Sequence, residues 1–507
     1  MKKIVIIIVL FSLISYGCSD FLDTEPADRY TQDNYWKTQE RALAALNGVY
    51  ATLLNGGMYG GTRPLYMENL SPNTYHRRGD DAIIAQGLHN SNTGWFNAAW
   101  NAAYQGIGRA NNFLGNIDRV PMDSNLKERY IAEAKFLRAL YYFPLWNLFG
   151  GAPLITDPTS AVDQEFLPRN SADELLTQIL KDLDDASKPD VLPKSFSGAE
   201  KGRVTIGAVL ALKARVLLYA GRFAEAAAVA KQVIDLNVYR LFPDYRGLFY
   251  LENEGNEEVI FDVQFKYPEF TNSYDAELIE QNNVGPLPDL VNDYYDINGA
   301  PVSESEIYDP DKPYENRDPR LKATVIVKGS MFNGAEVVEG TSTFYFSMTG
   351  YGMKKYTVYK DDTRTTPVSA GYSHLNYIVL RYADVLLMYA EAQNEASGPN
   401  DDVYKYLNEI RERAGMPDVT PGLSKDDLRK EIRHERRIEL AGEGLYYYDV
   451  RRWRIAHEVL NDDIHNDKGE RIDYRRFQNP RDYLWPVPSV AIQNNPNLLP
   501  QNEGYGI

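Results

Sequence analysis

Aromatic side chains and planar polar side chains are interleaved in two stretches of the chain, 55–96 and 241–376. A sugar ring presents C–H groups on one face and hydroxyls at its edge. A flat ring beneath it, with amide, carboxylate or guanidinium groups around it, would therefore hold it. Both stretches contain these residue types. The alternative is that the rings pack the two stretches onto the rest of the fold, which is the simpler interpretation for any single ring.

Six residues are the candidates for ligand contact. We expect stacking faces from Tyr75, Trp95 and Tyr274, and contacts with hydroxyl edges from Arg77, Asp80 and Asn97. A single stacking contact contributes on the order of 1 kcal/mol, by analogy with aromatic pairs. A site of this kind would bind its ligand with modest affinity.

No motif of a catalytic or metal centre is present. The patterns HExxH, GxSxG and the phosphate-binding loop do not occur, and the six histidines are scattered. We therefore expect no catalytic zinc and no cofactor. Outside an EF-hand loop, the carbonyl and carboxylate ligands of calcium form no recognisable sequence pattern, so the sequence does not decide whether a structural calcium ion is bound. A hydrolase would need two carboxylates roughly 5 to 10 Å apart, and among 71 acidic residues the sequence cannot select such a pair.

The segment 428–453 is unusually rich in charge. On a helix, its glutamates at 431, 435, 439 and 443 form one stripe and its arginines at 429, 433 and 437 form another. Like charges four residues apart destabilise an isolated helix by a few tenths of a kcal/mol per pair. We therefore expect structural ion pairs between these arginines and acidic groups elsewhere in the fold. A site for an anionic ligand is the alternative.

Helical periodicity dominates the rest of the chain. Apolar residues recur at helical spacing on both sides of Gly221-Arg222 within 205–236, which predicts a hairpin of two helices. A second hairpin is predicted over 382–414, and further helices over 41–54, 100–118 and 126–148, where Pro144 should kink or end the helix. The fold class is mostly α, with helical hairpins of the tetratricopeptide type as its scaffold.

Three long segments lack this periodicity and are expected to be non-helical. They are 55–96, 149–169 and 241–376, and the last includes a short alternating strand over 259–265. Insertions between helical repeats are where binding usually takes place. The two aromatic stretches coincide with two of these insertions.

The overall composition excludes several functions. The chain has 507 residues and a formal charge of −17, which argues against binding to nucleic acid, because phosphate backbones require a basic surface. It has one cysteine, so it cannot form a disulfide within itself. It has 37 tyrosines, about twice the usual share, and most of these are expected to pack between helices.

The first residues predict export. Lys2 and Lys3 precede an apolar run over 4–13, which is too short to span a membrane. A small residue, Gly17, stands directly before Cys18, and this arrangement resembles a bacterial lipoprotein signal in which the cysteine carries the lipid. We expect a signal peptide over 1–17 and a single domain over 18–507. An ordinary signal peptide with an incidental cysteine is the alternative.

Several longer motifs occur in a fixed order along the chain. They include AALNGVY at 44–50, AKFLRALYYF at 134–143, NRDPR at 316–320, LRYADVLLMYAE at 380–391, ERRIEL at 435–440, DVRRW at 449–453 and LWPVP at 484–488. In these motifs the chain resembles the SusD/RagB family of outer-membrane lipoproteins. The resemblance runs nearly from end to end, but the variable insertions match nothing residue by residue.

The resemblance implies a fold and a role. It implies about four tetratricopeptide-like hairpins, no enzymatic activity, and a lipid-anchored position in the outer membrane facing the outside of the cell. It also implies that the protein captures glycans for a SusC-like TonB-dependent transporter. Some relatives bind peptides, so a peptide-capturing protein is the main alternative. A surface glycoside hydrolase and a scaffold that binds only protein are weaker ones.

Overall fold

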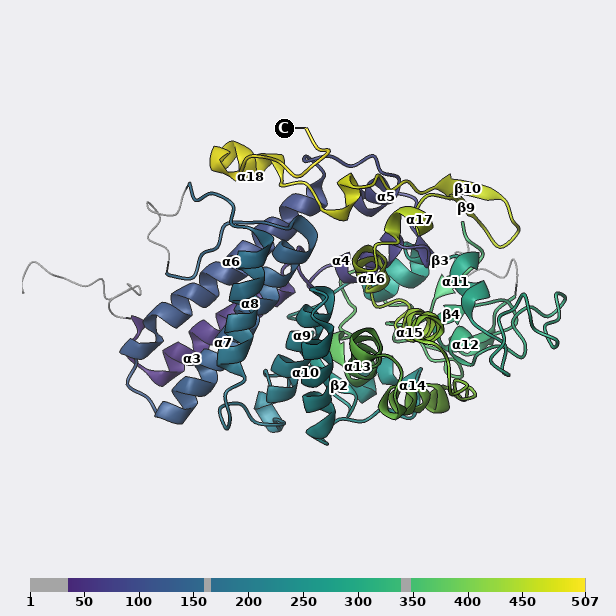
Figure 1. Cartoon of the computed structure of the whole chain (residues 1–507), viewed down its shortest axis with the longest axis horizontal. Helices are drawn as coiled ribbons and strands as arrows, with labels where there is room; N and C mark the ends of the chain where they lie inside the picture. Colours follow the sequence, from purple (N-terminus) through teal and green to yellow (C-terminus); the bar gives the residue numbers. More distant parts are fainter. Residues whose placement is uncertain (1–34, 159–165, 339–347, 507) are drawn as a thin grey trace, which may run out of the picture.

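A row of packed helices crosses the molecule, and loops with short elements lie beyond it (Figure 1). The computed structural model describes residues 35–158, 166–338 and 348–506. The expected signal peptide and Cys18 lie outside these ranges. The row consists of α3 (Gln39–Ala51), α6 (Gly94–Asn116), α7 (Ser124–Pro144), α8 (Ala172–Ala186), α9 (Ile206–Tyr219), α10 (Phe223–Asp235), α13 (Tyr382–Ser397), α14 (Asp401–Ala414) and α15 (Lys425–Glu439).

The predicted hairpins are confirmed. Thr205 caps α9 by accepting a hydrogen bond from the Ala208 amide, and Gly221 turns the chain into α10 with a φ of +71°. The side chain of Asn400 caps α14 in the same way. Packed pairs α3 with α6, α7 with α8, α9 with α10, and α13 with α14 make up the row. This arrangement confirms the mostly α fold class.

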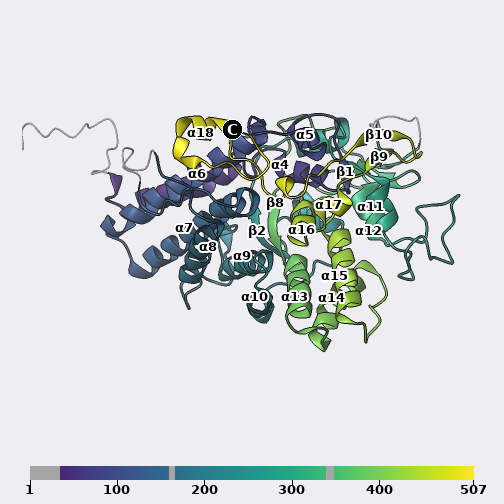
Figure 2. The same ribbon diagram turned by 45° about the horizontal axis from the view of Figure 1, so that its top comes forward.

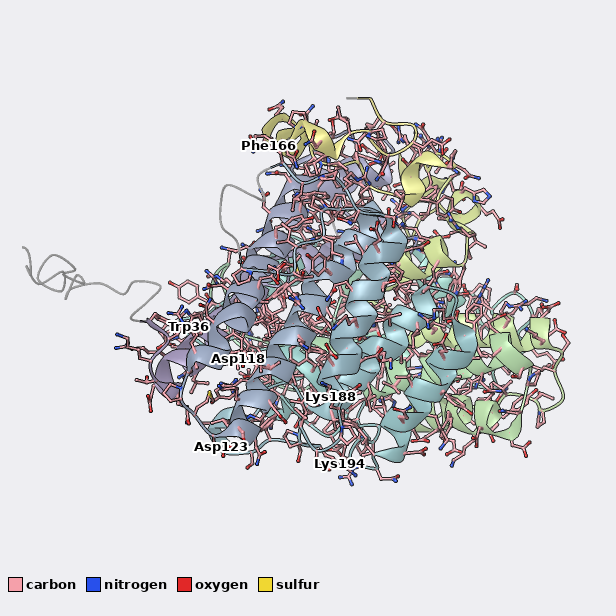
Figure 3. The ribbon with its side chains drawn as sticks, turned by 60° about the vertical axis from the view of Figure 1, so that its left-hand side comes forward. Trp36, Asp118, Asp123, Phe166, Lys188 and Lys194 are labelled. Atoms are coloured by element: carbon pink, nitrogen blue, oxygen red, sulfur yellow. The ribbon has the colours of Figure 1, made fainter. Side chains whose placement is uncertain are left out.

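The connections between these helices gather at the two ends of the helices. Asp118 and Asp123, between α6 and α7, lie at the same end as Lys188 and Lys194, between α8 and α9 (Figure 3). Phe166, which precedes α8, lies at the opposite end. Pro144 ends α7 as expected, and the chain continues through a π-helical turn over Leu145–Phe149.

The strands are short and pair two by two. The predicted strand is β2 (Val259–Val263), which lies with β8 (Tyr377–Arg381) at the centre of the molecule and packs on α9 (Figure 2). The other antiparallel pairs are β1 (Thr74–Tyr75) with β3 (Gly285–Pro286), β4 (Val325–Ile326) with β7 (Gly352–Met353), β5 (Met331–Phe332) with β6 (Ala335–Glu336), and β9 (Asp463–His465) with β10 (Arg471–Tyr474).

Two of the segments expected to be non-helical contain short helices, which corrects that expectation. These helices are α4 (Arg63–Tyr66) and α5 (Asp80–Ala85) in the first, and α11 (Pro288–Asp293) and α12 (Arg320–Thr324) in the third; α16 (Tyr446–Arg452), α17 (Ala456–Val459) and α18 (Ser489–Asn494) follow near the C-terminus. Helices of four to seven residues show too few turns for a periodic pattern. The sequence signal of α4 and α5 is a residue that favours the first turn, Pro64 in α4 and Asp80 in α5.

Two of the three arginines in the stripe of α15 pair with acidic groups elsewhere in the fold, as expected: Arg437 lies 2.9 Å from Asp293, and Arg429 pairs with Glu395. The glutamates of α15 form buried ion pairs as well, which the sequence did not predict. The Glu439 carboxylate lies 2.7 Å from Arg381 and 3.1 Å from Arg320, and Glu435 lies 3.1 Å from Arg411. The nearby arginines hold the pKa of Glu439 well below its usual range. These residues therefore tie α15 to α12, β8 and α14 as part of the scaffold.

Candidate functional site

Three aromatic side chains of the third insertion stand open to solvent. Tyr267 is 50% exposed, and Phe270 and Tyr372 are each 55% exposed. The rings of Tyr267 and Tyr372 are stacked, with centroids 5.9 Å apart and planes 29° apart, and His374 lies 6.2 Å from Tyr267. We call Tyr267, Phe270, Tyr372 and His374 the aromatic platform. Large exposed rings are costly to keep in water, so a cluster of this kind marks a binding surface.

Backbone hydrogen bonds hold the platform in place. Lys266 and Phe270 exchange two of them, at 2.7 and 2.8 Å, and close a tight loop that carries Tyr267. The Asn272 amide donates to the Ser373 carbonyl at 2.7 Å, and its side chain donates to the Leu375 carbonyl at 3.0 Å. Two segments about a hundred residues apart are thereby joined. The platform is preorganised rather than assembled on ligand binding.

A groove of about 610 Å³ meets the platform at Phe270, and Lys266 lines it beside that ring. Its walls come from α3 and the turn after it, the loop before α9, the end of β2, and the segment that enters β8. Lining side chains with amide, charged or phenolic groups are Asn47, Tyr50, Lys201, Arg203, Glu254, Asp262, Gln264, Lys266 and Asn376. The groove therefore combines hydrogen-bonding groups with an aromatic edge, as an oligosaccharide requires.

Asn376 joins two carboxylates on the wall of the groove. Its backbone amide donates to Glu254 at 2.8 Å and its side chain donates to Asp262 at 2.9 Å. Burial raises the pKa of Glu254 to about 7 and the pKa of Asp262 to about 6, and hydrogen bonds from Asn376 oppose both shifts. The charge of the groove therefore changes between about pH 5 and pH 8.

The prediction that Tyr75 and Tyr274 offer stacking faces to a ligand is wrong. Tyr274 is fully buried, packs edge-on against Phe265, and donates a hydrogen bond to the Tyr59 carbonyl at 3.2 Å. Tyr75 is buried in β1 and donates to Asp473 at 2.9 Å. A ring enclosed by protein offers no face to a ligand, so both residues act as packing anchors for their loops.

Of the other four, Asp80, Trp95 and Asn97 lie around the start of α6, and Arg77 lies in the loop before α5. Asp80 accepts a hydrogen bond from the Trp95 amide at 2.7 Å, Asn97 accepts one from Asn101 at 3.2 Å, and the Arg77 side chain is exposed. Trp95 is half-buried, and the guanidinium of Arg63 lies 5.5 Å from the centre of its ring. The structure thus brings Asp80 and Trp95 together. Ligand contact by these four residues stays a prediction.

Tyr372 and His374 are the platform residues that the sequence did not single out. Both belong to the segment GYSH at 371–374, inside the third insertion, about a hundred residues after Tyr267. A glycine and three polar or aromatic residues indicate a loop, but the pairing with Tyr267 depends on the Asn272–Ser373 bridge. Only the three-dimensional structure shows that bridge.

No three His, Cys, Asp or Glu side chains in 35–158, 166–338 and 348–506 gather as they would around a metal ion. None of the helices in those ranges has the length and apolar character needed to cross a bilayer.

Comparison with known proteins identifies the family. Residues 254–505 match the model described as the SusD family, and residues 20–218 match one described as starch-binding associating with outer membrane. A SusD-like protein of Formosa agariphila is 29% identical over the whole length of both chains. The chain belongs to the SusD family.

Solved structures agree with this assignment. A SusD-like carbohydrate binding protein from Bacteroides fragilis superposes with a TM-score of 0.84 at 29% identity, covering 92% of this chain and all of that one. A laminarin binding SusD-like protein superposes with a TM-score of 0.70 at 26% identity, covering 93% of this chain and all of that one.

Proposed function

We propose that this protein is a non-catalytic glycan-binding protein that holds an oligosaccharide on the aromatic platform and in the groove beside it. The observation that carries the proposal is the exposed, stacked pair Tyr267 and Tyr372. The third exposed ring of the platform, Phe270, lines a groove with hydrogen-bonding walls. The relatives described as carbohydrate, starch or laminarin binding support this ligand class. Arg77, Asp80, Trp95 and Asn97 are proposed as further contacts.

The proposal extends to the cell surface. The protein would be anchored in the outer membrane through lipid on Cys18, facing the outside, and would deliver its glycan to a SusC-like TonB-dependent transporter. The family description that mentions the outer membrane supports this location. Co-purification of a tagged chain with a TonB-dependent transporter from detergent-solubilised membranes would support the partnership.

The first test is isothermal titration calorimetry of the mature chain from Ser19 onward, without lipid. The panel contains starch, laminarin, host-mucin and other microbial glycans, and a peptide pool. Saturable heat with one glycan class is the expected result. Saturable heat with peptides alone would replace the proposal with the peptide-capturing alternative.

Glu254 and Asp262 make the hydrolase alternative testable in the same experiment. Both carboxylates line the groove and both have raised pKa values, which is the pattern of a general acid. Their bonds to Asn376 account for them as structural groups. We expect no heat after binding saturates and no released sugars by chromatography; sustained heat with release of shorter glycans would establish turnover.

A further inference from the structure

A small cavity lies at the start of the first insertion. It has a volume of about 90 Å³ and is lined by residues from the loop before α4, the end of α7, α9, β8 and the segment that leads into α16. Its polar lining includes two guanidinium groups, Arg63 and Arg215, and the phenols of Tyr59, Tyr219 and Tyr448. A cavity of this size has room for several water molecules or for one small ion with its contacts.

Arg63 is a buried cation without a carboxylate partner. Its side chain is 8% exposed, and it donates to the carbonyls of Gly57 at 3.1 Å and Trp95 at 3.3 Å. No carboxylate in the part of the chain that the structure describes lies within ion-pair distance of it. Burial lowers the pKa of Arg63 to about 10, so it still carries its charge at neutral pH.

The indole rings of two tryptophans flank this guanidinium. Its central carbon lies 5.5 Å from the Trp95 ring and 5.3 Å from the Trp485 ring. Ring faces attract a cation, but they carry no net charge, and a buried charge normally requires a counter-charge. The two rings therefore position Arg63 without neutralising it.

The other charged groups of the cavity are already paired. Arg215 lies 2.7 Å from Asp384. Glu443 also lines the cavity, but its carboxylate accepts hydrogen bonds from Arg381 at 2.9 Å and from Lys355 at 3.0 Å. Arg63 thus leaves the cavity with an excess of positive charge.

We propose that the cavity binds a small monovalent anion of the halide class against Arg63, with the hydroxyls of Tyr59 and Tyr448 as further donors. Both phenols interact electrostatically with Arg63 and Arg215. Burial raises the pKa of Tyr59 and of Tyr448, so both keep their protons as donors. The anion supplies the counter-charge and stabilises the base of the first insertion. This site is separate from the groove and does not depend on the proposed function.

Bromide is the probe, because it substitutes for chloride and gives an anomalous X-ray signal. The mature chain is melted in sodium bromide and in sodium gluconate at equal ionic strength. We expect bromide to raise the melting temperature saturably, by about 1–2 °C. The variant Arg63→Met should lose this response. The control Arg222→Met, at an exposed ion pair with Glu225, should keep it.

A crystal of the unmodified chain soaked in bromide tests the site directly, even where Arg63→Met does not fold. An anomalous peak in the cavity within contact of Arg63 is expected. A cavity without a peak, or equal melting temperatures in bromide and gluconate, would overturn the proposal. So would a bromide response that survives in Arg63→Met.

Discussion

Tyr267 and Tyr372 are the residues on which the proposed function depends most. Their exposed, stacked rings form the flat surface of the platform. Loss of one stacking ring costs about 1 kcal/mol, so Tyr267→Ala and Tyr372→Ala should each weaken glycan binding about fivefold by calorimetry. Phe166→Ala is the matched control, because Phe166 is similarly exposed but lies before α8, outside the platform and the groove. Equal losses in all three variants would contradict a specific platform.

Tyr274 should matter for stability rather than for direct ligand contact. It is fully buried against Phe265 and Tyr356, and removing a buried aromatic ring costs about 3–5 kcal/mol. Tyr274→Ala should lower the free energy of unfolding in urea by this amount. Tyr274→Phe removes only the hydrogen bond to Tyr59 and should cost about 1 kcal/mol. Equal losses of stability in Tyr274→Ala and Tyr274→Phe would contradict the packing role of the ring.

Glu254 should make stability depend on pH. Its pKa is about 7 in the folded chain against an ordinary value of 4.5, so between these values the folded state binds more protons than the unfolded state. Its contribution to stability therefore falls as pH rises through this range. Glu254→Gln stays neutral and keeps an acceptor for the Asn376 amide. By urea unfolding, we expect the variant to be more stable than the unmodified chain at pH 8 and similar in stability at pH 4.5. A stability difference between the two that does not change with pH would show that ionisation of Glu254 does not cause the pH dependence.

The site shows what residue types can and cannot predict. The interleaving of aromatic and polar residues correctly indicated that the third insertion presents exposed rings, as Tyr267 and Phe270 do. It could not distinguish these from Tyr274, only a few residues away, because loops have no periodic face. Which ring points outward is decided by contacts such as that of Tyr274 with the Tyr59 carbonyl. That partner lies more than two hundred residues away in sequence.

At the scale of elements, α15 holds several other elements together through buried ion pairs. Glu439 bonds to Arg320, Arg381 and Arg413, which come from three other elements. Glu439→Gln leaves buried cations without their counter-charge and should cost about 3–5 kcal/mol in the free energy of unfolding. Glu431→Gln is the control on the same helix, since Glu431 forms no ion pair with any described residue, and it should change stability by less than about 0.5 kcal/mol. Similar costs for both would show that the network contributes little.

Helices could be predicted from the sequence where apolar residues recur at helical spacing over several turns. The hairpin of α9 and α10 shows two apolar stripes and a glycine turn, and the structure places both helices within a residue or two of the expected ends. The partner strand β8 was not expected, because all five of its residues are buried. A strand buried on both faces has no alternation and runs directly into α13. The long-range pairing with β2 is what defines it.

At the scale of the whole molecule, the family motifs and the aromatic platform lie in different parts of the fold. The motifs shared with the family, such as LRYADVLLMYAE at 380–391, lie in β8 and α13, where Arg381 and Asp384 are buried in ion pairs. The platform comes instead from two parts of the third insertion, 267–270 and 372–374, that carry none of these motifs. Fold could therefore be inferred from sequence while the ligand could not, because the shared residues maintain the scaffold and the variable ones form the site.

This division predicts that anchoring and glycan binding are separable. Cys18 precedes Trp36, at one end of the helical row in Figure 3, by a segment that can reach at most about 60 Å. The groove and the platform are built from residues 47 onward. Cys18→Ala should therefore move the protein from the membrane fraction to the soluble fraction while its dissociation constant for glycan stays within about twofold. A variant that stays in the membrane fraction would exclude lipid on Cys18 as the anchor. A soluble variant with lost affinity would place the N-terminal segment in the binding site.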